Sequence, residues 1–562
     1  MRIRFGTPSP SQLVVGSSAS LGGITCLGLL GGLVGVRSTN SFSALLVVAA
    51  GIALGVFAAQ RLDVESSAHS RTDRFTLVVP GLFLAAGLRW LVRPASIRLS
   101  WLFDTWDGTT NPGVVTYSMV TGNIGHDTSI VSQWETYPRA PHFAIGQVAR
   151  LAEGVGLSSA TDRTTIYALG LWFTYSIMLA AVGLVAVRLA QVLGFDRRVA
   201  LPIALVAQAF LCLATNLEKT LLLHSLSFLT CIAVCMSLVV VWLSLEQRDE
   251  LHWRGLLLFS LHIVVVVETF PLVLPFVAVI VMVMVARFGK QIPFQSPFAM
   301  ASLIVPLAIA TPRLLDQFQH STQTDHVATG GHLLALSSGL VVALGLVGIL
   351  GAIVFAFRHR VGRHAAIVLV GSILVPAAAW VMVGNFDRTY GLNYYPKKVE
   401  LFTLVVVVAM APVALLRPLR QFRRHLVGKA AGAITAALVV LAIWNGPLST
   451  PSTIPADSPA RRYITAAFDE ADNSSESVVF GPNVMMSTYA SMMSNLIDKK
   501  YWSVGYTNDR LLTIFQQLSV ADPNTAVQQL CSVLIRKPAV AAVVGATTSY
   551  RKRCDSMGFS RP

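Results

Sequence analysis

Residues 255–286 read GLLLFSLHIVVVVETFPLVLPFVAVIVMVMVA. The stretch holds two apolar runs separated by Glu268, Thr269, Phe270 and Pro271. It is therefore either one long kinked segment or two short membrane spans joined by a tight turn. The choice sets the side of the membrane on which the rest of the chain lies, because each additional crossing reverses the chain.

The composition around this stretch is that of a membrane protein. Of 562 residues, 54% are hydrophobic and 13% charged, and the mean hydropathy is +0.62. These values exclude a soluble multidomain enzyme, a coiled coil and a disordered chain. We predict a polytopic α-helical protein with about thirteen transmembrane helices. The apolar stretches are 12–36, 43–60, 75–93, 165–188, 199–214, 221–245, 255–268, 271–286, 298–312, 333–357, 365–384, 399–416 and 427–444.

We attribute the net charge of +15 to Lys and Arg residues in cytoplasmic loops, which set the orientation of the chain in the membrane. Its cations are scattered through short loops and form no basic face, so no nucleic-acid partner is expected. With a cytoplasmic N-terminus, every inside loop is basic only if 255–286 crosses twice, which favours the turn and places the C-terminus outside. The cations of the inside loops are Arg61, Arg71, Arg74, Arg188, Arg197, Arg198, Arg248, Arg254, Arg287, Lys290, Arg358, Arg360, Arg363, Arg417, Arg420, Arg423, Arg424 and Lys429.

Two large polar regions then lie on the outer side of the membrane. Residues 1–445 form the transmembrane domain, which contains a large outside loop at 94–164. Residues 446–562 alternate between helix and strand patterns, which predicts a small extracytoplasmic α/β domain. Cys531 and Cys554 in this region are the cysteines able to pair, whereas the other four lie in apolar runs.

The loop at 94–164 is rich in aromatic and acidic residues. Asp104, Asp107 and Glu135 lie beside tryptophans near the membrane boundary. Partial desolvation there raises carboxylate basicity, so one of them can act as a general base. Alternatively, the tryptophans form an aromatic belt and the carboxylates are solvated.

Several motifs of this loop resemble a known group. Trp106-Asp107, a helix ending in Thr121-Gly122-Asn123, and Tyr137-Pro138 followed by His142 resemble uncharacterised actinobacterial multi-span proteins of GT-C glycosyltransferase type. More distantly, the chain resembles the arabinofuranosyltransferases of mycobacterial cell-wall arabinan. The resemblance implies a bacterial plasma membrane, a polyprenyl-phosphate sugar donor and an acidic catalytic residue in the first large outside loop. In the group a His follows Trp-Asp, whereas this chain has Thr109-Thr110-Asn111-Pro112, so any role of that His does not carry over.

Glycosyl transfer from a lipid phosphate needs a base for the acceptor hydroxyl and donors for the departing phosphate. Asp107 is the first candidate for the base and Asp104 the second. The candidate donor-binding cluster consists of Tyr137, Arg139 and His142, in which Arg139 offers a bidentate grip. The alternative is that Tyr137-Pro138 starts an interfacial helix to Leu151, with Arg139 at lipid headgroups.

A second candidate site for the donor phosphate and sugar precedes the span at 399–416. It contains Arg388, Tyr394, Tyr395, Lys397 and Lys398, on the side where cations are depleted. A polyprenyl phosphate is an anion at the headgroup plane and would explain the cluster. The alternative is that the two lysines anchor the chain to phospholipids.

Acceptor-binding is assigned to Glu268 and Glu135. A carboxylate between two apolar spans, as at Glu268, is costly unless it has a partner. No cofactor is expected beyond the lipid-linked donor. A divalent cation stays open, since the histidines at 320, 326 and 332 match no strong ligand motif.

The function that follows is transfer of a sugar from a polyprenyl-phosphate donor to a cell-envelope glycan or glycolipid on the outer face, with arabinofuranose as one candidate. The expected partners are membrane lipids, the donor and the acceptor. A transporter or flippase of a lipid-linked sugar or envelope glycolipid is the alternative; it should show interrupted spans and charges near mid-membrane. A non-catalytic envelope scaffold would not need the clustered residues of the loop.

Overall fold

The computed structural model describes residues 8–60, 62, 74–91, 106–125, 139–195, 197–213, 226–291, 296–321, 338–358, 360–384 and 394–414, with 528, 531, 555, 556 and 558 as single positions. All elements with bounds among these residues are helices. In chain order they are α1 (Pro10–Val34), α2 (Ser41–Ala59), η1 (Phe75–Leu77), α4 (Val78–Leu91), α6 (Trp106–Thr121), α7 (Ala140–Gly154), α8 (Ala160–Val192), α9 (Arg197–Leu213), α11 (Leu226–Arg248), α12 (Trp253–Val267), η4 (Pro271–Val273), α13 (Leu274–Phe288), η5 (Gly289–Gln291), α14 (Pro297–Ser321), α16 (Ser338–Ala356), α17 (Arg360–Gly384) and α18 (Tyr394–Ala414).

The apolar stretches predicted from the sequence overlap these helices, except 427–444, which lies outside the described residues. Within the described residues, six helices are long and apolar enough to cross a membrane: Pro10–Val34, Ser41–Ala59, Ala160–Val192, Leu226–Arg248, Pro271–Gln291 and Pro297–Asp316. By length and composition the chain is thus a helical membrane protein, while the number of about thirteen spans stays a prediction. Most of 446–562, where an α/β domain is predicted, lies outside the described residues.

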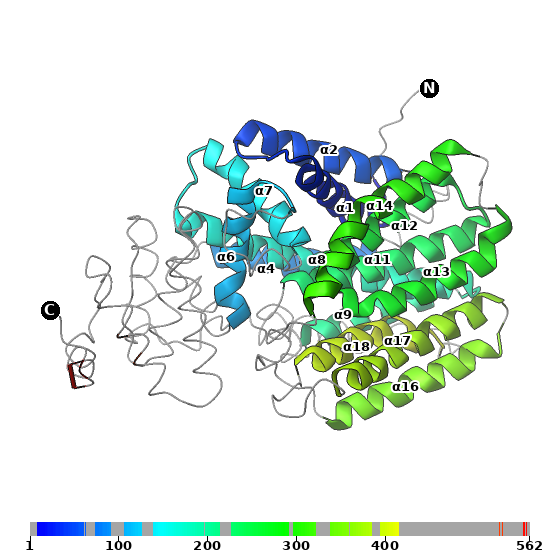
Figure 1. Cartoon of the computed structure of the whole chain (residues 1–562). Helices are drawn as coiled ribbons and strands as arrows, with labels where there is room; N and C mark the ends of the chain where they lie inside the picture. The colour runs from blue at the N-terminus through cyan, green and yellow to red at the C-terminus, as the bar shows by residue number, and fades with distance from the viewer. Residues whose placement is uncertain are drawn as a thin grey trace.

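The bundle is built around α8 and α11 (Figure 1). The membrane-length window of α11 is entirely buried, so this helix has neighbours on all sides. The hairpin of α1 and α2 packs on one side, and α16, α17 and α18 pack together on the opposite side. Helices at the periphery bury much less of their apolar surface; for example, only 28% of the α2 window is buried. Exposed apolar side chains on these outer helices suit a lipid environment.

The turn between α12 and α13 reverses the chain. The backbone N–H of Leu251, before α12, donates to Oε1 of Gln291, after α13, at 3.2 Å. The start of α12 and the end of α13 therefore lie at the same end of the bundle. Residues 255–286 are thus two helices joined by a turn at Glu268, as expected, while their crossing of the membrane stays a prediction.

Polar contacts gather the basic turns at this same end. Arg188 of α8 donates to Gln247 at 2.8 Å and to Ser11 at 2.9 Å. Arg287 of α13 pairs with Glu246 of α11 at 3.1 Å, and His364 of α17 lies 3.2 Å from the other oxygen of Glu246. These contacts join turns that the sequence analysis assigned to one side of the membrane.

Candidate functional site

Helices α6 and α7 run parallel at the opposite end of the bundle, joined by residues outside the described part. His142 near the start of α7 lies beside Asn111 of α6, and Arg150 near its end donates to the carbonyl of Met119. Between these contacts, Gly146 approaches α6 so closely that a Cβ would lie 3.2 Å from the carbonyl oxygen of Val115. The two helices thus present their N-termini side by side.

Local sequence explains where these helices begin and end. Gly122 has a φ of +65°, which stops α6, and a Cβ there would lie 2.7 Å from the backbone nitrogen of Ser38. Pro141 occupies the first turn of α7, where its missing N–H is tolerated. A helix is expected from Pro138 to Leu151 and is observed as Ala140–Gly154. Arg139 before it is 0% exposed, which disfavours the alternative of an arginine at lipid headgroups.

Glycines of α1 allow the α6–α7 pair to pack closely on the bundle. A Cβ at Gly28 would lie 2.6 Å from the ring of Phe143, and one at Gly32 would lie 2.6 Å from Gly125. Ser38, in the connection between α1 and α2, donates to Gln147 of α7 at 2.7 Å. The α1–α2 connection therefore lies at the same end of the bundle as α6 and α7.

A buried charged cluster lies where α7 begins. Arg139 precedes α7, Glu268 lies in the α12–α13 turn, and Arg313 belongs to α14. Arg139 and Glu268 are 0% exposed and Arg313 is 6% exposed. Nε of Arg313 lies 3.4 Å from Oε1 of Glu268, and the N–H of Ala140 donates to the carbonyl of Glu268 at 3.1 Å. Three segments distant in sequence thus meet at the α7 N-terminus.

The Arg139 side chain is held by α6 and the residues that follow it. Its Nη2 donates to the carbonyl of Gly125 at 2.8 Å, and its Cζ lies 4.9 Å from the ring centroid of Tyr117. A fully buried guanidinium is costly unless it has an opposite charge nearby. Glu268 provides that charge.

Electrostatics at Glu268 follow from its burial. Burial raises the pKa of Glu268 above its ordinary value, while the charges of Arg313 and Arg139 and their hydrogen bonds to Glu268 oppose the rise. The partner expected for this carboxylate is therefore present: Arg139, a predicted donor-binding residue, and Arg313, which the sequence did not indicate.

His142 and Asn111 form a second buried contact in the same region. His142 is 0% exposed, and its Nε2 lies 3.0 Å from Oδ1 of Asn111. Asp107 lies one turn before Asn111 on α6, so helical periodicity places both residues on one face. The backbone thus brings the first candidate base to the same helix face as the neighbour of His142.

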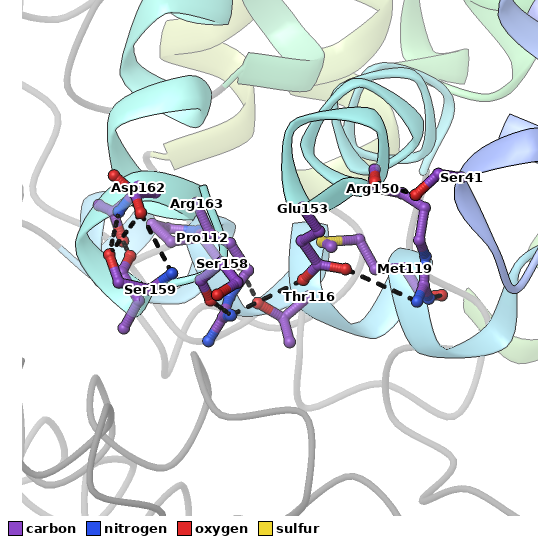
Figure 2. A network of polar contacts seen from close by, with 12 residues as sticks. Ser41, Pro112, Thr116, Met119, Arg150, Glu153, Ser158, Ser159, Asp162 and Arg163 are labelled. Carbon is purple, nitrogen blue, oxygen red and sulfur yellow. Dashed lines mark hydrogen bonds and ion pairs between the residues drawn. The ribbon is translucent and has the colours of Figure 1, made fainter. Parts of the chain in front are cut away.

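At the other end of the helix pair, a hydrogen bond fixes α7 to α6 and an ion pair fixes it to α8 (Figure 2). Glu153 lies 3.7 Å from Arg150 and 3.9 Å from Arg163 of α8. Arg163 also donates to the carbonyl of Ser158 at 2.6 Å, and Arg150 bonds the α6 C-terminus at Met119. Cations at helix C-termini are stabilising. This network anchors the helix pair, and none of the residues selected from the sequence belongs to it.

The remaining selected residues divide between two groups. Tyr394, Tyr395 and Lys397 lie on the first turn of α18. Lys398, the next residue, is buried, with 5% of its surface exposed. Burial of Lys398 disfavours the alternative of a lysine extended to phospholipid headgroups. Asp104, Glu135, Tyr137 and Arg388 lie outside the described residues. Within the described part of the chain, no group of three or more His, Cys, Asp or Glu side chains is arranged for a metal ion.

Sequence reasoning missed Arg313, Asn111 and Tyr117. Arg313 follows Pro312 directly after a predicted span, which marks it as a cation at a membrane boundary. That signal fits a lipid anchor equally well, and only the packing of α14 against α12 distinguishes the two. Asn111 lies a few residues after Trp106-Asp107, where the group that this chain resembles has a His. The motif therefore pointed to this part of the chain but did not indicate that Asn111 contacts His142.

Comparison with known proteins adds no assignment. No family model matches this chain, and no curated protein matches it.

Proposed function

We propose that this chain is a membrane glycosyltransferase that moves a sugar from a polyprenyl-phosphate donor to a glycan or glycolipid of the cell envelope. Arabinofuranose is the sugar to test first, because of the distant resemblance to arabinofuranosyltransferases. The observation that supports the proposal most is the meeting of Arg139 and Glu268 beside His142. Arg139 and Glu268 are predicted separately from the sequence, as a donor-binding and an acceptor-binding residue, and they lie in one buried cluster.

The proposed reaction needs a base and a cation. Asp107 removes the proton of the acceptor hydroxyl, whose oxygen then attacks the anomeric carbon of the sugar. The bond from that carbon to the phosphate oxygen breaks, and polyprenyl phosphate leaves with the electron pair. Arg139 and His142 stabilise the charge on the leaving phosphate. Burial of Arg139 strengthens such a contact, because electrostatic interactions grow as water is excluded.

The start of α18 supplies the second proposed contact with the donor. Lys398 is buried near the beginning of this helix. We propose that Lys397 and Lys398, together with Tyr394, Tyr395 and Arg388, bind the phosphate and sugar of the donor. A buried lysine retained on an apolar helix is expected to have such a function.

The proposed orientation places α6, α7 and the α12–α13 turn outside. The end of the bundle that contains Arg188, Arg287 and His364 would then be cytoplasmic, in agreement with the positive-inside rule. Cys531 supports this orientation, because it is disulfide-bonded and disulfides persist mainly in oxidising compartments. Its proposed partner, Cys554, lies outside the described residues.

The test is sugar transfer in membranes that contain Asp107→Asn. Loss of a general base is expected to lower the rate by about 10²–10⁴-fold, while expression and thermal stability stay unchanged. Glu153→Gln is the matched control, because it removes a carboxylate from the distant end of the α6–α7 pair. Full activity of Asp107→Asn would move the base to Asp104 or Glu268. Full activity of the corresponding variants of all three carboxylates, Asp107, Asp104 and Glu268, would refute the mechanism.

Analysis of a deletion strain identifies the substrates. Mass spectrometry of polyprenyl-linked sugars and of the wall glycan should show an accumulated donor and a missing sugar in the glycan. An accumulated donor together with unchanged transfer activity in isolated, permeable membranes would instead favour the flippase.

A further inference from the structure

The α7 N-terminus is fixed by two segments that lie far from it in sequence. The carbonyl of Glu268 accepts the N–H of Ala140 at 3.1 Å, and the backbone N–H of Arg139 donates to the Glu268 carboxylate. A carboxylate at a helix N-terminus is favoured by the helix dipole. One residue of the α12–α13 turn therefore holds the backbone of Arg139 and Ala140, and its carboxylate interacts electrostatically with the Arg139 guanidinium.

Arg313 in turn fixes Glu268. Its Nε lies 3.4 Å from Oε1 of Glu268, and its Nη1 donates to Oδ2 of Asp316 at 3.0 Å. The Asp316 contact lies within α14, so the guanidinium is oriented by its own helix. Arg313 of α14 therefore orients Glu268, and Glu268 in turn holds the start of α7.

We propose that Glu268 and Arg313 are positioning residues that hold Arg139 for the donor phosphate. The inference rests on the proposed function and changes the role of Glu268, which acts through Arg139 and does not touch the acceptor. A fully buried carboxylate that lies 3.4 Å from Arg313 and accepts the backbone N–H of Arg139 suits this role better than exchangeable contacts with acceptor hydroxyls.

The arrangement predicts a selective kinetic defect. Without Arg313 the Glu268 carboxylate loses its orientation, and the α7 N-terminus with Arg139 loses the support of the α12–α13 turn. Affinity for the donor should fall, whereas contacts with the acceptor do not depend on this pair.

The experiment compares Arg313→Met, Arg313→Lys and Arg287→Met in the full-length protein. Arg287→Met is the matched control, because it also breaks a largely buried arginine–glutamate pair, at the opposite end of the bundle. Two quantities are measured: the KM for a short-chain polyprenyl-phosphoryl arabinofuranose, and hydrogen exchange of peptides covering residues 140–150.

Arg313→Met should raise the donor KM by about tenfold, which is ~1.4 kcal/mol, leave the acceptor KM unchanged and accelerate exchange at the start of α7. Arg313→Lys should restore part of both properties, and Arg287→Met should change neither.

Unchanged exchange in Arg313→Met would overturn the inference. Accelerated exchange with an unchanged donor KM would also overturn the inference, because the Glu268–Arg313 pair would then only stabilise the fold. Absence of sugar transfer by the unaltered protein from any polyprenyl-phosphate donor would instead refute the proposed function, and with it the donor-binding role of Arg139.

Discussion

At the scale of single residues, Glu268 carries a balance of charge and burial that can be measured. Burial raises its pKa above the ordinary value of 4.5, and the nearby Arg313 and Arg139 reduce but do not cancel this effect. A carboxyl with a raised pKa in the folded state binds its proton more tightly when the protein is folded. Its contribution to stability is therefore complete below pH 4.5 and is lost as the pH rises through the raised pKa.

Glu268→Gln removes this titration. We expect the melting temperature of the unaltered protein, relative to that of Glu268→Gln, to fall as the pH is raised from about 4.5. Thermal unfolding in detergent, followed from acidic to neutral pH, measures the difference. Glu153→Gln serves as the comparison for carboxylates elsewhere on the helix pair. A difference that is constant over this range would show that burial does not dominate at Glu268.

Residue roles were predictable only where the chemistry is local. A carboxylate between two apolar runs is costly unless it has a partner, and this local pattern is sufficient to predict a function for Glu268. The identity of the partner was not predictable, because Arg313 lies forty-five positions further along the chain and its own context fits a lipid anchor. Asn111 was hidden for a related reason: a carboxamide before a proline usually marks a turn, whereas here it lies inside α6 beside His142.

At the scale of elements, glycine determines how closely the N-terminal helices pack. A Cβ at Gly55 of α2 would lie 2.3 Å from the backbone nitrogen of Ser20 in α1. Small residues allow such close packing of helices in membranes, where dispersion and not water exclusion drives association.

Gly55→Ala should therefore destabilise the α1–α2 hairpin. The added methyl group meets backbone atoms that cannot rotate away, and the expected cost is about 1–3 kcal/mol. Gly345→Ala is the matched control, because nothing lies within 4 Å of a Cβ there and the helix gains roughly 0.5–1 kcal/mol. Thermal unfolding of both variants gives the comparison. Equal melting temperatures would mean that α1 and α2 separate enough to accept the methyl group.

Element positions followed from the sequence more fully than element contacts. Apolar runs located the helices because a membrane requires long hydrophobic segments. The parallel pairing of α6 and α7 was not predictable, since neither helix is long or strongly apolar and their contact depends on Gly146. The α12–α13 reversal was predictable from charge alone, because only two crossings keep Arg287 on the same side as Arg254.

At the scale of the whole molecule, the two ends of the bundle differ in their connections. One end joins α8, α11, α13 and α17 through Arg188, Arg287 and His364. The other joins α6, α7 and α14 through Arg139, Glu268 and Arg313. The proposed chemistry requires the second end to face outside, where the wall glycan lies, so orientation is a test of function as well as of topology.

Single cysteines at exposed positions can measure this orientation. Val155, in the turn after α7, is 79% exposed, and Phe357, in the turn after α16, is 85% exposed. The four cysteines of the helices are buried and Cys531 is disulfide-bonded, so these native cysteines should react little. Labelling of the unaltered chain measures the background reaction. In intact cells, a membrane-impermeant maleimide should label Val155→Cys and should reach Phe357→Cys only after permeabilisation. The reverse pattern would place Asp107, Arg139 and Glu268 at the cytoplasmic face. A polyprenyl-phosphate donor consumed outside the membrane could not then reach them, and the proposed transfer reaction would have to be abandoned.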